Sequence, residues 1–189
     1  GICPVSHHLV AAKAIDQIAG ISALSAPALK LRRLMHFAQV LQSHALHFFH
    51  LASPDLLFGF QSPVEQRNIV AVITQQPQIA IKGVKIRKFG QQILEAISGK
   101  RIHGMAAIPG GMNAPLTPEK IQPFMQDVQQ IIDWCEETVN LSRQLTDQNR
   151  DFHLQFGLIE SPSHLPGLAS EAFIAALPKA ELHLHIEGT

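Results

Sequence analysis

The fold class is decided by the stretch TPEKIQPFMQDVQQIIDWCEETV, residues 117–139. Its apolar residues recur at three- and four-residue spacing, which is the period of one face of an α-helix. We expect one continuous helix from Thr117 to about Leu145, long enough to serve in a bundle. Its buried stripe is predicted to contain Ile121, Phe124, Met125, Val128, Ile131, Ile132, Cys135 and Val139.

Capping and breaking residues predict four helices ahead of this one. Ser6 is a candidate N-cap, and the segment from Ser62 to Glu65 has the pattern of a capping box. Gly20 and Gly99 are expected stops, and Pro54 is expected to end the second helix. The four helices are predicted over residues 9–19, 27–52, 63 to before 77, and 79–98. Residues 101–115 are expected to be strand or extended loop, so the fold class is mainly α, a partial bundle of long helices with little β structure.

The composition changes towards the C-terminal end of the sequence. Ser161-Pro-Ser-His-Leu-Pro-Gly167 is typical of a linker. We therefore expect a helical unit over residues 1–158, a linker over 159–169, and a short tail over 170–189 outside the core.

Overall composition excludes several classes of function. The formal net charge is zero, which argues against a nucleic-acid binder. No apolar run reaches the roughly 18 residues of a membrane helix. Two cysteines favour a reducing compartment, hence a cytoplasmic location. Charged residues are only 16% of the chain, against about 25% in typical domains, which predicts a surface largely covered by partners.

Four histidines lie on one arc of the predicted second helix, opposite its apolar arc. They are His36, His44, His47 and His50. The spacing of the last three suits a helical metal pair or a proton relay. However, no acidic residue lies between Lys30 and Pro54. This favours a structural role for the histidines, or hydrogen bonding to residues that themselves bind a metal.

The first eight residues, Gly-Ile-Cys-Pro-Val-Ser-His-His, form the strongest candidate for a site. The Cys3 thiolate is a soft ligand that suits nickel, iron, copper(I) or zinc. His7 is a candidate ligand, or a donor to the cysteine sulfur. A single cysteine cannot hold a metal without further ligands from other parts of the protein. The alternative is that Cys3 is a buried, inert cysteine beside a helix cap.

This opening, followed by Ala11-Ala-Lys-Ala14, resembles the first cysteine motif of nickel–iron hydrogenase large subunits, most nearly the cytoplasmic bidirectional, NAD-linked type. Segments at residues 42–55, 88–90, 99–103 and 107–112 agree, so the resemblance covers about residues 1–155. It implies that Cys3 is a thiolate bridging nickel and iron. It also implies that His7 donates a hydrogen bond to that thiolate.

The resemblance further implies reversible oxidation of H₂ at a nickel–iron centre whose iron carries cyanide and carbon monoxide. Electrons would pass through an iron–sulfur small subunit to diaphorase subunits that reduce NAD. The family uses four thiolates, of which this sequence matches only Cys3, since Cys135 falls on the apolar stripe. We therefore expect the chain by itself to be inactive, with the centre unassembled.

The segment from Ala176 to Thr189 resembles the opening of adenosine and adenine deaminases. His183 and His185 would lie two apart on a strand and face one zinc together, as half of a tetrahedral site. Weak zinc binding is the expectation. A zinc-dependent deaminase is thus one alternative function, and a non-catalytic helical fragment is another. Two truncated motifs in one chain predict a fragment joined to a fused piece.

Overall fold

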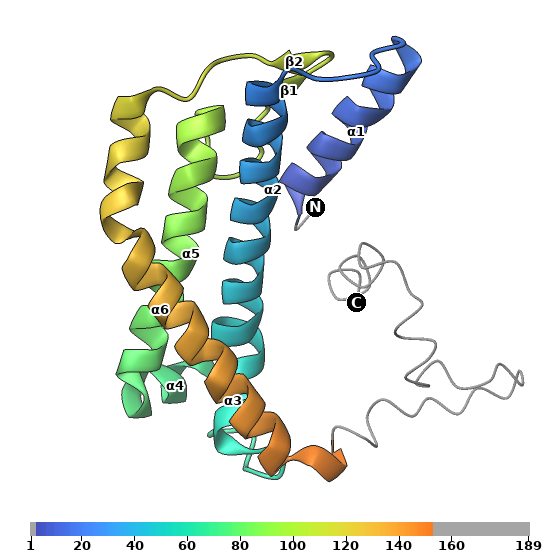
Figure 1. Cartoon of the computed structure of the whole chain (residues 1–189). Helices are drawn as coiled ribbons and strands as arrows, with labels where there is room; N and C mark the ends of the chain where they lie inside the picture. Colours follow the sequence, from blue (N-terminus) through green and yellow to red (C-terminus); the bar gives the residue numbers. More distant parts are fainter. Residues whose placement is uncertain (1–2, 153–189) are drawn as a thin grey trace, which may run out of the picture. The chain divides into compact units, whose positions relative to one another are not determined.

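The computed structural model describes residues 3–152 and confirms a mainly α fold (Figure 1). Within these residues the β structure is one antiparallel hairpin in which Ala107 pairs with Met112. None of the helices described is long and apolar enough to cross a bilayer. The elements are α1 (Pro4–Ile18), α2 (Ala26–Leu46), the π-helix η1 (His47–Ala52), α3 (Ser53–Phe58), α4 (Ile69–Gln75), α5 (Pro77–Ser98), β1 (Ala107–Ile108), β2 (Gly111–Met112) and α6 (Pro118–Gln148).

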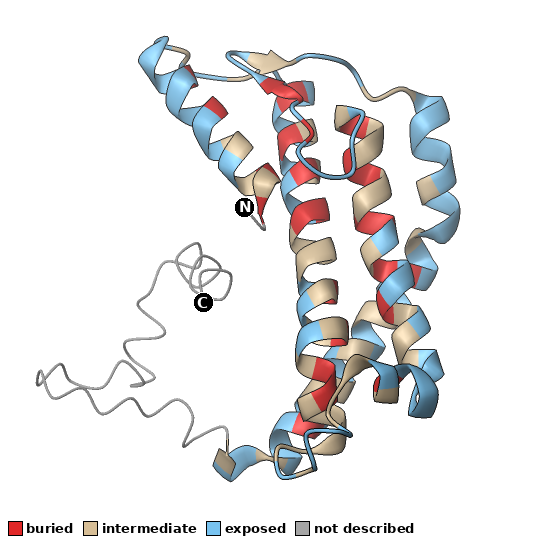
Figure 2. Ribbon diagram, turned by 180° about the vertical axis from the view of Figure 1, so that it is seen from behind, coloured by how far each residue is buried: buried red, intermediate tan, exposed pale blue. Residues whose placement is uncertain are grey.

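Residues 3–137 form one compact unit, and a second unit begins at Thr138, within α6. In the first unit α2 and α5 run side by side, with α1 on the other side of α2 (Figures 1 and 2). Met35 and Leu94 are fully buried between the helices. The core cluster consists of Val5, Met35, Ala38, Ala45, Phe49, Ile86, Phe89, Ile93, Leu94, Ile97, Ala106 and Ile131. The predicted boundary at 158–167 lies outside the described residues.

Two glycines of α5 allow it to lie close to α2 and η1. A Cβ on Gly90 would stand 2.8 Å from the carbonyl oxygen of Ala38, and one on Gly83 would stand 2.4 Å from the Cβ of Phe49. Real Cβ atoms do not approach neighbours so closely, so any side chain at either position would push the helices apart. The contact of α5 with α2 therefore depends on Gly90 and its contact with η1 depends on Gly83, despite the cost of glycine to helix formation.

The second helix does not end at Pro54, contrary to the sequence prediction. A π-helical turn over His47–Ala52 leads directly into α3, where Pro54 lies in the first turn. Proline is tolerated there because the first N–H groups of a helix have no intrahelical acceptor. Ser53 Oγ donates to the Phe49 carbonyl, four residues earlier in the chain, over 2.6 Å.

The predicted helix starts were also wrong at two places. Helix α1 begins at Pro4 with Cys3 as N-cap, rather than at a cap on Ser6. Helix α4 begins at Ile69, where the Asn68 side chain accepts from the Ala71 N–H over 3.0 Å. At α1 the proline lies at the start of the helix, and at α4 the cap is the Asn68 side chain. The predicted helix ends at Gly20 and Gly99 were correct. Both glycines have positive φ, of 70° and 75°.

Helix α6 is continuous, as predicted, but only part of its apolar stripe is covered. Ile131 is buried, and Phe124 packs edge-to-face on Phe89 with ring centroids 6.0 Å apart. Val128 and Cys135 are half-buried against the same core. The exposed members lie along one flank of the stripe, which is wider than the contact: Ile121, Met125, Ile132 and Val139 are 37%, 65%, 44% and 50% exposed.

Candidate metal centre

Cys3 lies at the N-cap of α1 and is buried, with 7% of its surface exposed. Pro4 fixes the first helical residue, and the His7 N–H donates to the Cys3 carbonyl over 3.3 Å. The thiol therefore lies at the positive end of the α1 dipole, which stabilises a thiolate. This is a suitable environment for a metal-binding sulfur.

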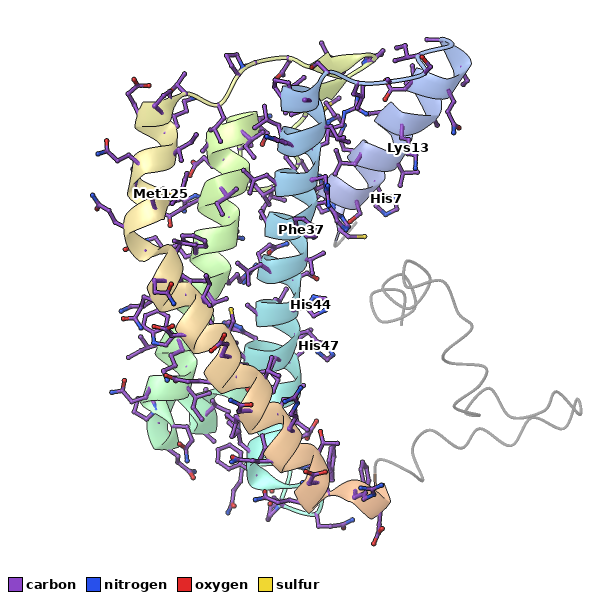
Figure 3. All side chains as sticks on the ribbon, in the orientation of Figure 1. His7, Lys13, Phe37, His44, His47 and Met125 are labelled. Carbon is purple, nitrogen blue, oxygen red and sulfur yellow. The ribbon has the colours of Figure 1, made fainter. Side chains whose placement is uncertain are left out.

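His7 lies one turn after Cys3 and its side chain is exposed (Figure 3). The helical spacing of four residues places both on the same face of α1. A hydrogen bond from the His7 ring to the Cys3 sulfur stays a prediction.

Three of the four histidines of the predicted second helix are exposed, and the fourth is half-buried. His36 and His44 of α2 and His47, the first residue of η1, are exposed. Figure 3 shows His44 and His47 on the same side of the molecule, beyond Phe37, and His44 Nδ1 lies 2.9 Å from the Val40 carbonyl. His50 is half-buried, because the π-turn changes the rotation between successive residues. Burial, followed by the charge of Arg87, lowers the pKa of His50.

Across residues 3–152, no three histidine, cysteine or acidic side chains are grouped in a way that could hold a metal ion. Cys135 packs against the core, and burial raises the pKa of its thiol. His183 and His185 lie outside the described residues. Of the predicted N-terminal site, the structure therefore describes Cys3 and His7.

His8, which was not among the predicted site residues, joins the first half of α1 to the hairpin segment. Its Nε2 accepts hydrogen bonds from the backbone N–H groups of Ala106 and Ala107, over 3.1 and 3.0 Å. An acceptor nitrogen requires a neutral ring. Burial, and then the charge of Arg32, lowers the pKa of His8 and favours this neutral form. The signal was hidden, because His7 and His8 are adjacent and only His7 has helical spacing from Cys3.

Asp16 and Arg32 join the second half of α1 to α2 and to the hairpin. Arg32 Nη1 donates to Asp16 Oδ2 over 2.5 Å, and Arg32 Nη2 donates to the carbonyl of Ile108 over 2.8 Å. Arg32 also donates to the Gly111 carbonyl, while the Gly110 N–H donates to Asp16 Oδ1 over 2.8 Å. The hairpin thus connects the two helices through both members of the ion pair.

The hydrogen bond from Arg32, followed by that from the Gly110 N–H, lowers the pKa of Asp16. The carboxylate therefore stays ionised beside the guanidinium. One sequence signal was available for this pair. Arg32 lies between Ala28 and Met35 at helical spacing, and both neighbours are buried, so a charged residue occupies the apolar arc of α2.

Comparisons with known proteins agree with the resemblance of the N-terminal motif. The nickel-dependent hydrogenase family matches residues 1–59. One subunit of the F420-non-reducing hydrogenase vhu of Methanocaldococcus jannaschii is 42% identical over 85% of this chain and 38% of its own length. The NAD-reducing hydrogenase HoxS subunit beta of Cupriavidus necator is 39% identical over 75% of this chain and 31% of its own length.

A solved structure agrees with these relatives. The crystal structure of an NAD⁺-reducing [NiFe]-hydrogenase in the H₂-reduced state matches with a TM-score of 0.80 and 47% identity, over 85% of this chain and 36% of that chain. The chain belongs to the nickel-dependent hydrogenase family. It corresponds to a segment of a large subunit and spans about a third of the length of these relatives. The comparisons lend no support to a deaminase.

Proposed function

We propose that this chain is the Cys3-bearing helical segment of a nickel–iron hydrogenase large subunit whose parent reaction is the reversible oxidation of H₂. The observation that carries the proposal is the placement of Cys3. Its thiol is buried at the N-terminus of α1, in a fold that matches an NAD⁺-reducing [NiFe]-hydrogenase with a TM-score of 0.80. In this proposal Cys3 contributes a thiolate to the nickel–iron centre, and His7 hydrogen-bonds to its sulfur.

The described residues do not fit a whole nickel–iron centre by themselves. They supply one buried thiol at a helix N-terminus and no cluster of three potential ligands. Such a centre needs several soft thiolate ligands. The other ligands, including the groups on iron, therefore have to come from outside residues 3–152, and we derive no chemical step at the metals.

We further propose that electrons pass to NAD in the cytoplasm, through diaphorase subunits that receive them from an iron–sulfur small subunit. The NAD-reducing relatives support the choice of acceptor. Many large apolar side chains in the described part of the chain face outwards, which supports contact with further protein. They include Val10, Phe37, Leu51, Val70 and Met105, which are 68%, 58%, 65%, 64% and 74% exposed.

A chimeric hydrogenase tests this function. The corresponding segment of the NAD-reducing hydrogenase HoxS subunit beta would be replaced by residues 3–152. Nickel content and H₂-dependent NAD⁺ reduction would then be measured on the purified complex. We expect both to be retained in the chimera, and both to be lost in its Cys3→Ser variant.

Cys135→Ser is the matched control, because this thiol packs against the core cluster rather than at the start of α1. It should keep nickel and activity. A chimera that assembles with its partner subunits and retains nickel after Cys3→Ser would refute the assigned role of Cys3. An assembled complex without any nickel would refute the proposed function.

A further inference from the structure

We propose that His8, Asp16 and Arg32 are positioning residues that set where the Cys3 thiol lies. The inference rests on the proposed function for its significance, because the position of Cys3 matters only if its sulfur binds metal. The three residues attach α1 to the hairpin and to α2 at two points along its length.

Helix α1 has little apolar surface with which to orient itself. Its buried residues are Val5, Ala12 and Asp16, and one of these is charged. Of its larger apolar side chains, Leu9 packs against the edge of the core cluster, whereas Val10, Ile15 and Ile18 are 68%, 46% and 85% exposed. Nonpolar packing is not directional, and so small a contact allows a helix to slide or rotate. Directed hydrogen bonds therefore have to determine its orientation.

The first point of attachment is close to Cys3. His8 Nε2 accepts from two successive backbone N–H groups, those of Ala106 and Ala107, at 3.1 and 3.0 Å. Both residues are buried, and Ala106 belongs to the same core cluster as Val5. Two donors converging on one nitrogen restrict both the rotation and the translation of the first turns of α1.

The second point lies two turns further on. Asp16 accepts from Arg32 and from the Gly110 N–H, and Arg32 donates to the carbonyls of Ile108 and Gly111. Both members of the pair are 9% exposed, so water does not readily replace these bonds. A helix held at two points along its axis cannot pivot about either one. The orientation of its N-cap residue, Cys3, is fixed as a consequence.

The experiment measures how fast iodoacetamide alkylates Cys3 in the 189-residue chain, with Cys135 as internal reference and peptide mass spectrometry as readout. No metal is needed. We expect His8→Ala and Asp16→Asn each to increase the Cys3 rate by about tenfold through local opening of α1. The Cys135 rate should change by less than about twofold, because its surroundings on α6 do not open with α1.

Two further variants separate positioning from general stability. His8→Gln retains a side-chain acceptor and should restore Cys3 protection to near the wild-type level. Arg101→Gln breaks a surface pair with Glu95 that is 52% and 45% exposed, and should leave both rates unchanged. Arg32→Lys keeps the charge but loses the guanidinium fork that reaches the hairpin carbonyls, so it should expose Cys3.

The proposal is overturned if Cys3 stays protected in His8→Ala and Asp16→Asn, or if Cys3 and Cys135 become reactive in parallel. Circular dichroism shows whether each variant is folded, and if Asp16→Asn is not, His8→Ala decides. The result is separable from the proposed function. Loss of nickel binding in the chimera would leave the alkylation result standing, and continued protection of Cys3 would leave the assigned metal ligand standing.

Discussion

The carboxylate of Asp16 on α1 and the guanidinium of Arg32 on α2 form a buried ion pair, with 2.5 Å between Oδ2 and Nη1. Both members also bond to the backbone of the hairpin, so neither charge relies on the other alone. A buried ion pair of this kind stabilises the folded state little relative to an apolar pair of similar size. Removing one partner, however, leaves the other charge buried and unpaired, which is strongly destabilising. The relationship therefore has consequences for stability.

Replacing Arg32 with methionine should lower the melting temperature strongly, by on the order of 10 °C, because Asp16 is left buried without its partner. Thermal unfolding followed by circular dichroism checks this. Arg67→Met is the control, since it breaks the more exposed pair with Asp55, whose side chains are 24% and 41% exposed. Equal falls in the two variants would contradict the special role of the buried pair.

Stability should decrease as the pH falls below about 6.5, the ordinary pKa of histidine. The pKa of His8 is lowered by burial and by Arg32, and that of His50 by burial and by Arg87. The unfolded chain therefore binds these protons more readily, and stability is lost as the pH approaches the lowered folded-state values. Urea unfolding between pH 7 and 5 measures the slope.

His8→Gln should flatten this slope, because glutamine accepts hydrogen bonds without titrating. His50→Gln should remove a separate part of the pH dependence. The double variant should show a flatter slope of stability against pH than either single variant. An unchanged slope in the double variant would show that neither histidine is responsible.

Gly90→Ala should destabilise the protein by about 1–2 kcal/mol. Overpacking against α2 outweighs the gain of at most about 1 kcal/mol in helix propensity. The neighbour in question is the backbone carbonyl of Ala38, which cannot rotate away. Gly111→Ala is the matched control, since nothing lies within 4 Å of its added Cβ. Equal unfolding free energies in the two variants would contradict the close α2–α5 contact.

Val128→Asp should destabilise the first compact unit by about 1–3 kcal/mol, because it places an unpaired charge against the core. Met125→Asp lies on the exposed flank of the same helix, where the native side chain is 65% exposed (Figure 3). It should change the unfolding free energy by less than about 0.5 kcal/mol. Similar losses for both would mean that the covered face of α6 is wrongly assigned.

The 189-residue chain alone should not acquire stoichiometric nickel and iron, because a single thiolate makes an incomplete ligand set. Zinc should bind weakly, through His183 and His185, and His183→Ala should abolish it. Metal analysis and titration calorimetry measure these quantities. Hydrogen uptake by the chain alone, or ammonia release from adenine or adenosine, would contradict the expectation.

Local signals in the sequence were sufficient for most of the helices. Apolar periodicity predicted α6, and glycines that adopt positive φ predicted the ends of α1 and α5. These signals succeed because a helix is formed by contacts between residues three and four apart. The motif around Cys3 likewise pointed to the family, since its residues are adjacent in the chain.

Tertiary structure alone decided which residues hold α1 in place. Asp16 bonds to an N–H 94 residues away, and His8 bonds to N–H groups 98 and 99 residues away. No local pattern contains that information, because the partners are backbone groups without a residue type to recognise. The same limit explains the exposed flank of α6. The sequence shows which residues form the apolar stripe, but not how much of that stripe the neighbouring helices cover. The sequence by itself determined where most of the helices form and which family its N-terminal motif resembles, and only the packing of the helices and hairpin decided how the N-terminus of α1 is held.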